Sequence, residues 1–183
     1  MQLLTPIQVA AELSDFDESL CVHLLSDLPE ELNRQRRKGG AFSEAQCAGA
    51  AKHVLESMHT ITAELFAAYK GQFSTFQPIP SCFEHYGLDF MVDEDLRVWL
   101  LEVNPGPDFK QTGRRLERVV ATMLDDSVTV ALDRDLGIRE KGGEISGDSM
   151  ERAHSRTRGT GFTAIYADEW SSSKAGDSGM TMF

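Results

Sequence analysis

The run GLDFMVDEDLRVWLLEVNPGP, residues 87–107, determines how the rest of this sequence is interpreted. Residues 88–92 and 97–103 are rich in apolar and β-branched side chains, which is typical of strands. The acidic residues 93–95 between them favour a turn, so the spacing predicts an antiparallel hairpin. Oxygen-bearing side chains stand in or just after the two predicted strands, at Asp89, Glu102 and Asn104.

These three side chains predict a site for a hard cation. Carboxylates and amides in strands are costly to bury unless a partner compensates them. Mg²⁺ is such a partner, because it takes oxygen ligands and bridges them to phosphates. We therefore interpret Asp89, Glu102 and Asn104 as metal ligands, and the acidic residues 93–95 as solvated turn residues.

The relative position of the three side chains depends on the length of the turn. An even turn places Asp89 opposite Leu100, with both on one face of the hairpin. Alternation along the strand then brings Glu102 and Asn104 to that face, with Asp89 and Glu102 as diagonal neighbours roughly 7–8 Å apart. An odd turn breaks this arrangement. The opposite face is expected to pack into the core, and it carries Leu88, Phe90, Val92, Trp99, Leu101 and Val103.

Residues 87–95, 98–104 and 105–113 together resemble the C-terminal catalytic core of the tubulin–tyrosine ligase-like proteins, which belong to the ATP-grasp superfamily of carboxylate–amine ligases. The resemblance is strong over residues 64–118 and weaker around residues 161–170. It implies an α+β fold that is the C-terminal portion of an ATP-grasp fold, with an antiparallel sheet and packed helices.

The resemblance also implies an activity. ATP and Mg²⁺ would be the cofactors, and Asp89, Glu102 and Asn104 would hold the metal against the phosphates. The acceptor would be a protein carboxylate such as that of a tubulin tail, and the donor a free amino acid. No catalytic side chain beyond the metal ligands is required. Lys110, in the following Pro- and Gly-rich loop, is a candidate contact to ATP or substrate, with an exposed loop lysine as the alternative.

A second function stays open at this point. The upstream half of an ATP-grasp cleft, which supplies lysines over the phosphates, has no match in residues 1–40. The chain is therefore expected to be the C-terminal part of a ligase. The alternative is a noncatalytic ATP-grasp-derived binding module or pseudoenzyme, although the intact set of three oxygen ligands argues against it.

Composition narrows the partners and the compartment. The formal net charge of −11 disfavours nonspecific binding to nucleic acid or to an anionic membrane surface. The basic residues 34–38 and Arg114, Arg115 and Arg118 are either solvated or available to an acidic protein tail. The 3 cysteines lack metal-site spacing, and neither a signal peptide nor a membrane span is evident. We expect a cytoplasmic protein, and we expect His85 to have a structural role.

The predicted organisation begins with residues 1–40, a partial N-terminal segment of uncertain structure whose residues 34–40 are read as a loop. Residues 41–136 form the predicted core. In it, Ser43 and Gln46 match a capping box that opens a helix to about Tyr69. The apolar stripe of this helix is expected to pack into the core, and it comprises Ala50, Val54, Leu55, Met58, Ile61, Leu65 and Phe66.

A second helix is predicted over residues 115–124, and residues 127–132 either continue it or form a strand. Its inward side chains are expected to be Leu116, Val119, Val120, Met123 and Leu124. Residues 137–158 are predicted to be a flexible insertion and residues 159–170 to supply the C-terminal strand of the core, at residues 161–166. The polar residues 171–183 are predicted to be a disordered tail.

Overall fold

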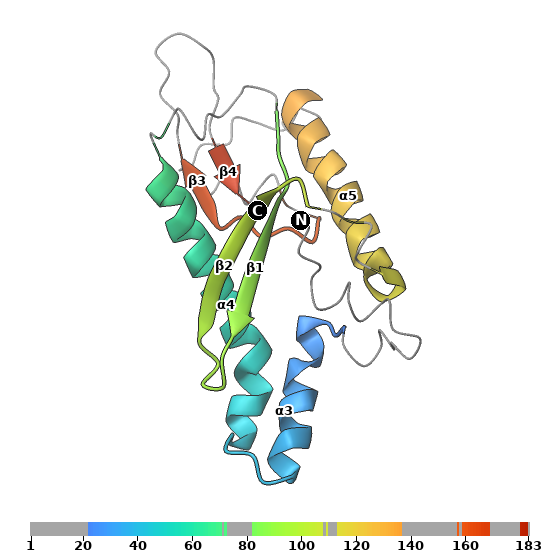
Figure 1. The fold of residues 1–183 in the computed structure, drawn as a ribbon. Coiled ribbons are helices and arrows are strands. Elements are labelled where there is room, and N and C mark those ends of the chain that lie inside the picture. The colour runs from blue at the N-terminus through green and yellow to red at the C-terminus, as the bar shows by residue number, and fades with distance from the viewer. Residues whose placement is uncertain are drawn as a thin grey trace, which may run out of the picture. The chain divides into compact units, whose positions relative to one another are not determined.

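The computed structural model describes residues 22–70, 72, 82–107, 109, 113–136, 157, 159–168 and 180–182. The fold is α+β, with helices and antiparallel strand pairs (Figure 1). The described residues fall into two compact units, one within residues 1–53 and 110–117 and the other within residues 54–109 and 118–183. In chain order the elements are η1 (Leu25–Asp27), α3 (Leu28–Arg37), α4 (Glu44–Tyr69), β1 (Tyr86–Val92), β2 (Val98–Pro105), α5 (Gly113–Leu136), β3 (Tyr166–Asp168) and β4 (Met180–Met182).

Helix α3 occupies part of the segment that was expected to be a loop, so the loop prediction for residues 34–37 was wrong. Pro29 stands in the first turn of α3, where a missing N–H is tolerated. Glu30 and Glu31 lie in that turn and the arginines of residues 34–37 in the last one, which complements the helix dipole at both ends. The polar composition therefore marks a solvated helix, and Leu32 supplies its buried contact.

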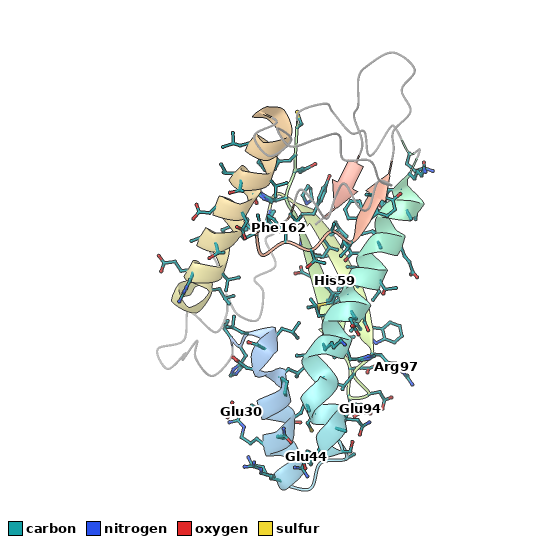
Figure 2. All side chains as sticks on the ribbon, turned by 180° about the vertical axis from the view of Figure 1, so that it is seen from behind. Glu30, Glu44, His59, Glu94, Arg97 and Phe162 are labelled. Atoms are coloured by element: carbon teal, nitrogen blue, oxygen red, sulfur yellow. The ribbon has the colours of Figure 1, made fainter. Side chains whose placement is uncertain are left out.

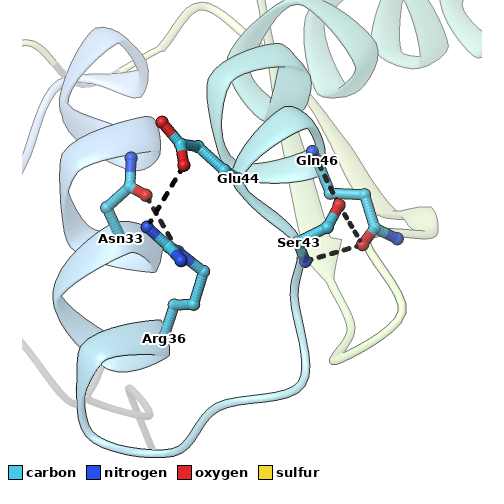
Figure 3. A network of polar contacts seen from close by, with 5 residues as sticks. All are labelled: Asn33, Arg36, Ser43, Glu44 and Gln46. Atoms are coloured by element: carbon cyan, nitrogen blue, oxygen red, sulfur yellow. Dashed lines mark hydrogen bonds and ion pairs between the residues drawn. The ribbon is translucent and has the colours of Figure 1, made fainter.

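The N-terminus of α4 has the predicted capping box (Figure 3). The Gln46 backbone N–H donates to the Ser43 hydroxyl at 3.3 Å, and the Ser43 backbone N–H donates to Gln46 Oε1 at 2.9 Å. Across the connection, Arg36 Nη2 of α3 lies 3.8 Å from Glu44 Oε2 of α4. The Arg36 Nε–H also donates to Asn33 Oδ1 at 3.4 Å. The ion pair between Arg36 and Glu44 joins the two helices at the short turn between them.

Helix α4 ends at Tyr69, as predicted, and its apolar stripe is largely confirmed. Ala50, Val54 and Phe66 are buried. Leu55 is 44% exposed, contrary to expectation, because it lies one position away from the buried row. Cys47 is fully buried and was missed, although it continues the row three residues before Ala50.

Helix α5 runs through residues 127–132, which settles the choice between helix and strand for that segment. The prediction that Val119 and Leu124 point inward was wrong, since they are 52% and 40% exposed. The half-buried positions include Leu116, Val120 and Met123. The buried row on α5 is thus narrower than hydrophobicity alone indicated.

Strand β3 begins at Tyr166, so the strand expected at residues 161–166 is displaced toward the C-terminus. It pairs antiparallel with β4, which lies in the segment predicted to be a disordered tail. The Gly161 N–H donates to Asp126 Oδ2 of α5 at 2.8 Å. The insertion expected at residues 137–158 lies, apart from Thr157, outside the described residues. No helix in the described part of the chain combines the length and apolar character needed to cross a membrane.

The capping box yields a stability prediction. Substituting Ser43→Ala removes the hydroxyl acceptor and leaves the Gln46 N–H without its cap, so we expect a loss of about 1 kcal/mol in the free energy of unfolding. Urea titration followed by circular dichroism measures this. Ser43→Asp keeps an acceptor at the same position and should stay close to wild type. Equal losses in both variants would show that the cap is not the source of the effect.

Candidate functional site in the β1–β2 hairpin

The turn of the hairpin joins residues 93 and 97 across a short loop. The Asp93 N–H donates to the Arg97 carbonyl and the Leu96 N–H donates to the Asp93 carbonyl, each at 3.0 Å. Leu96 has a φ of 63°, which is left-handed. A turn followed by one left-handed residue is a common way to close a hairpin whose loop has an odd number of residues. Burial of the Leu96 side chain offsets the strain at this position.

Asp93 organises this turn with its carboxylate. Its Oδ1 accepts from the backbone N–H groups of Asp95 and Arg97, at 3.0 and 2.9 Å. Its Oδ2 accepts from the Trp99 indole N–H at 3.1 Å. The indole hydrogen bond, followed by the Arg97 backbone bond, lowers the pKa of Asp93 below its ordinary value. Asp93 is therefore more than a solvated turn residue, while Glu94 and the exposed Arg97 fit that description (Figure 2).

An extra residue in β2 changes the register halfway along the hairpin. From the turn, Val92 pairs with Val98, Met91 with Trp99 and Phe90 with Leu100. The register then shifts, so that Asp89 pairs with Glu102 and Leu101 is left over. Without this bulge the odd turn would place Asp89 opposite Leu101 and Glu102 on the other face. The bulge therefore restores the two carboxylates to one face.

The shared face of Asp89 and Glu102 was predicted, but the register behind that prediction was wrong. The two residues are direct partners and not diagonal neighbours. Leu100 pairs with Phe90 and so lies on the half-buried face, away from Asp89. Trp99 and Leu101 were expected in the core, yet they are 51% and 62% exposed.

The three predicted ligands come together at the end of the hairpin away from the turn. The Asn104 Nδ2 group donates to Glu102 Oε1 at 2.7 Å and to Asp89 Oδ2 at 3.3 Å. The carboxamide thus bridges the two carboxylates and compensates part of their mutual repulsion. No other His, Cys, Asp or Glu side chain among the described residues joins them to make a larger acidic or metal-ligating group.

The chain turns sharply after Asn104 and folds back along β1. Gly106 has a φ of +68°, and its N–H donates to the His85 carbonyl at 3.0 Å. Gly87 pairs with Asn104, and a Cβ at Gly87 would lie only 3.2 Å from Pro107 Cβ. The two glycines therefore permit the close return of the loop beside the site. Asp108 and Lys110, the next charged residues, lie outside the described part of the chain.

His85 has the structural surroundings that were expected. Its Nε2 atom lies 2.7 Å from Ser127 Oγ of α5. The ring also makes edge-to-face contacts with Phe83 and Phe109, at centroid distances of 5.4 and 6.4 Å. Sequence reasoning did not find Ser127, because a serine in the middle of a helix carries no signal of a partner 42 residues away.

The pattern of the tubulin-tyrosine ligase family matches residues 26–137, which is more than half of the chain and includes the entire hairpin. The chain belongs to the tubulin-tyrosine ligase family. No solved structure gave a significant match.

Three relatives illustrate the reactions named within the family. The chain is 44% identical over 77 residues to the probable tubulin–tyrosine ligase PBY1 of Saccharomyces cerevisiae, covering 42% of this chain and 10% of that protein. It is 29% identical over 97 residues to the probable tubulin polyglutamylase TTLL9 of Bos taurus, covering 50% and 21%. It is 40% identical over 58 residues to the tubulin monoglycylase TTLL3 of Danio rerio, covering 32% and 8%. The matched part is thus about a tenth to a fifth of each relative.

The lowered pKa of Asp93 predicts how the turn responds to acid. The ionised carboxylate accepts the hydrogen bonds, so its contribution is present above the ordinary aspartate pKa of 3.8. That contribution is lost as the pH falls toward the lower pKa of the folded state. The stability difference between wild type and Asp93→Asn should therefore shrink as the pH is lowered from about 6 to 3. Urea titrations at each pH measure it.

The exposed Glu94 of the same turn provides the control for this measurement. Glu94→Gln removes a carboxylate that the turn does not use as an acceptor, so its effect should be small at every pH. A difference between wild type and Asp93→Asn that does not change with pH would contradict the assigned role of Asp93.

Proposed function

We propose that this chain supplies the metal-binding part of the catalytic core of an ATP- and Mg²⁺-dependent ligase, which joins an amino acid to a carboxylate of a protein. The observation that carries the proposal is the direct pairing of Asp89 with Glu102, bridged by Asn104, inside a hairpin that matches the family pattern. The proposal includes an ATP-grasp fold for the core, assigned to residues 41–136.

The donor set of the hairpin fits Mg²⁺. Asp89, Glu102 and Asn104 offer oxygen atoms only, and hard cations select oxygen ligands. The Asn104 N–H groups now face both carboxylates. Rotation of the carboxamide would present Oδ1 in their place and complete a three-oxygen set. When bound, Mg²⁺ would neutralise the phosphate charge that the two carboxylates alone would repel.

Apolar side chains beside the carboxylates favour a nucleotide as the ligand. Met91 and Trp99 are cross-strand partners on the same face as Asp89, and Met91 is 49% exposed. Leu101, the extra residue of the bulge, is also exposed. A nucleotide needs a cation site for its phosphates and apolar surface for its base, and this face offers both within one hairpin.

The proposed chemistry needs no nucleophilic side chain. The γ-phosphoryl group of ATP is transferred to an oxygen of the acceptor carboxylate, which gives ADP and an acyl phosphate. The amine of the amino acid then attacks the acyl carbon and loses a proton, and phosphate leaves. Asp89, Glu102 and Asn104 would hold the Mg²⁺ ion, which would supply charge neutralisation for the phosphates during transfer. Lys110 is proposed as a contact to a phosphate or to the substrate carboxylate.

The acceptor and donor are proposed from the relatives. Their names describe tyrosine ligation, polyglutamylation and monoglycylation of tubulin. We propose a protein acceptor of the tubulin type, a free amino acid as donor and a cytoplasmic location. Neither nucleic acid nor a membrane is a proposed partner, since the net charge of −11 opposes association with polyanions.

The metal ligands predict a selective loss of activity. In the full-length protein, Glu102→Gln should lower kcat/KM roughly a hundredfold, because one anionic ligand is lost. This factor corresponds to a loss of about 3 kcal/mol of transition-state stabilisation. The folded state should not be weakened, since the change also removes carboxylate repulsion beside Asp89. Glu94→Gln makes the same chemical change at the exposed turn and should leave kcat/KM unchanged. Near-normal turnover of Glu102→Gln would contradict the assigned site.

The nucleotide product separates a ligase from other ATP-dependent enzymes. With an acceptor protein, an amino acid and Mg²⁺-ATP, the full-length protein should form ADP and phosphate, and omission of either co-substrate should suppress their formation. Labelled tyrosine, glutamate and glycine, tested with tubulin, identify the donor. Formation of AMP would indicate an adenylating enzyme, and a stable phosphoprotein would indicate a kinase. Either result would overturn the assignment.

A further inference from the structure

The geometry around Ser127 determines which partner donates in the hydrogen bond between His85 and Ser127. The Ser127 hydroxyl lies 2.7 Å from the Met123 carbonyl, four residues earlier in α5. A carbonyl oxygen accepts only, so the single hydroxyl proton of Ser127 is directed at Met123. The hydroxyl must then accept from His85, whose Nε2 carries the proton. Ser127 is 8% exposed, so this contact is protected from water.

The backbone of His85 also contacts the chain segment that directly follows Asn104 of the candidate metal site. Its carbonyl accepts the Gly106 N–H at 3.0 Å, two residues after Asn104. The adjacent register pair is Tyr86 with Pro105, and the next is Gly87 with Asn104. The backbone of His85 therefore fixes the turn that follows Asn104, while its side chain is anchored to α5.

We propose that His85 is a positioning residue that uses Ser127 of α5 as its anchor to set the position of Asn104 for metal binding. This inference rests on the proposed function. Its physical basis is a continuous path through α5, the Ser127 hydroxyl, the His85 side chain and carbonyl, the Gly106 turn and the Asn104 carboxamide. The anchor restricts the hairpin end where the three oxygen groups meet, so less conformational freedom is lost when the metal binds.

Substitutions at His85 separate the hydrogen bond from the ring packing. His85→Phe keeps an aromatic ring against Phe83 and Phe109 but has no donor for Ser127. His85→Gln lacks the ring, but its side-chain N–H₂ can reach the same acceptor. We expect His85→Phe to weaken Mn²⁺ binding about tenfold, the lower end for residues that support metal ligands, and His85→Gln to restore most of the loss.

Helix α5 supplies a matched control for Ser127. The Thr129 hydroxyl donates to the Asp125 carbonyl at 3.0 Å, as the Ser127 hydroxyl does to Met123. Thr129→Val and Ser127→Ala each delete one such hydroxyl from the same helix, and only Ser127 also accepts from His85. Ser127→Ala should therefore weaken Mn²⁺ binding as His85→Phe does, whereas Thr129→Val should leave it unchanged.

The measurement is a titration of the full chain with Mn²⁺ alone, with the free ion read out by electron paramagnetic resonance and folding checked by circular dichroism.

Glu102→Gln tests the metal site itself. If Glu102→Gln leaves Mn²⁺ binding unchanged, the proposed function and this inference both fall. If Glu102→Gln abolishes binding while His85→Phe and Ser127→Ala retain it, only the positioning role is overturned. Equal losses in Ser127→Ala and Thr129→Val would overturn it too, because they would report a general weakening of α5.

If one of the two variants His85→Phe and Ser127→Ala fails to fold, Mn²⁺ binding is measured on the other. His85→Phe and Ser127→Ala remove the same hydrogen bond from opposite ends. If neither folds while Thr129→Val does, the contact is required for the fold as a whole and the specific positioning role is overturned.

Discussion

The alternation of side chains along a strand is the constraint on which the candidate site depends. The turn at Asp93 has an odd number of residues, and an unbroken register from that turn would place Glu102 opposite Leu88 on the half-buried face. One unpaired residue, Leu101, reverses this parity and brings Glu102 opposite Asp89. Both carboxylates then stand on the exposed face, where water screens their repulsion and a cation can reach them. The proposed metal site therefore depends on the bulge.

Each end of the hairpin is held by its own hydrogen bonds. At the turn, the Asp93 carboxylate accepts hydrogen bonds from two backbone N–H groups and from the Trp99 indole N–H. At the other end, the His85 carbonyl holds the Gly106 turn. The three oxygen-bearing side chains therefore project from paired backbone and not from a free loop. Groups on regular strands keep their geometry better than groups on loops, which suits the proposed metal site.

The family comparison fits a separation, within the longer relatives, between the residues that bind the metal and the residues that select the amino acid. Relatives named for three different amino acid transfers each match a part of this chain. A metal site for ATP is what such reactions would share, whereas the choice of amino acid needs contacts elsewhere. The exposed apolar side chains of the hairpin, among them Met91, Trp99 and Leu101, lie beside the proposed metal site. Such exposed apolar surface is suited to contact with a bound organic group.

The sequence by itself determined the elements with strong local signals. The capping box at Ser43, the helix to Tyr69 and the existence of the hairpin all follow from periodicity, capping chemistry and turn composition. Helix α3 was missed because it contains few apolar residues, and its signal lies in the charges at its two ends. Element type was thus readable wherever neighbours along the chain decide it.

Only the tertiary structure decided the register, the exposed side of each helix and the long-range contacts. The bulge at Leu101 depends on how two strands meet, so no count along one strand reveals it. Trp99 looks like a core residue in sequence, yet it is exposed because Asp93 accepts its indole N–H on the outer face. Ser127 acquires its role only when α5 meets His85. These outcomes depend on contacts between residues far apart in the chain, and local propensity carries no information about such contacts.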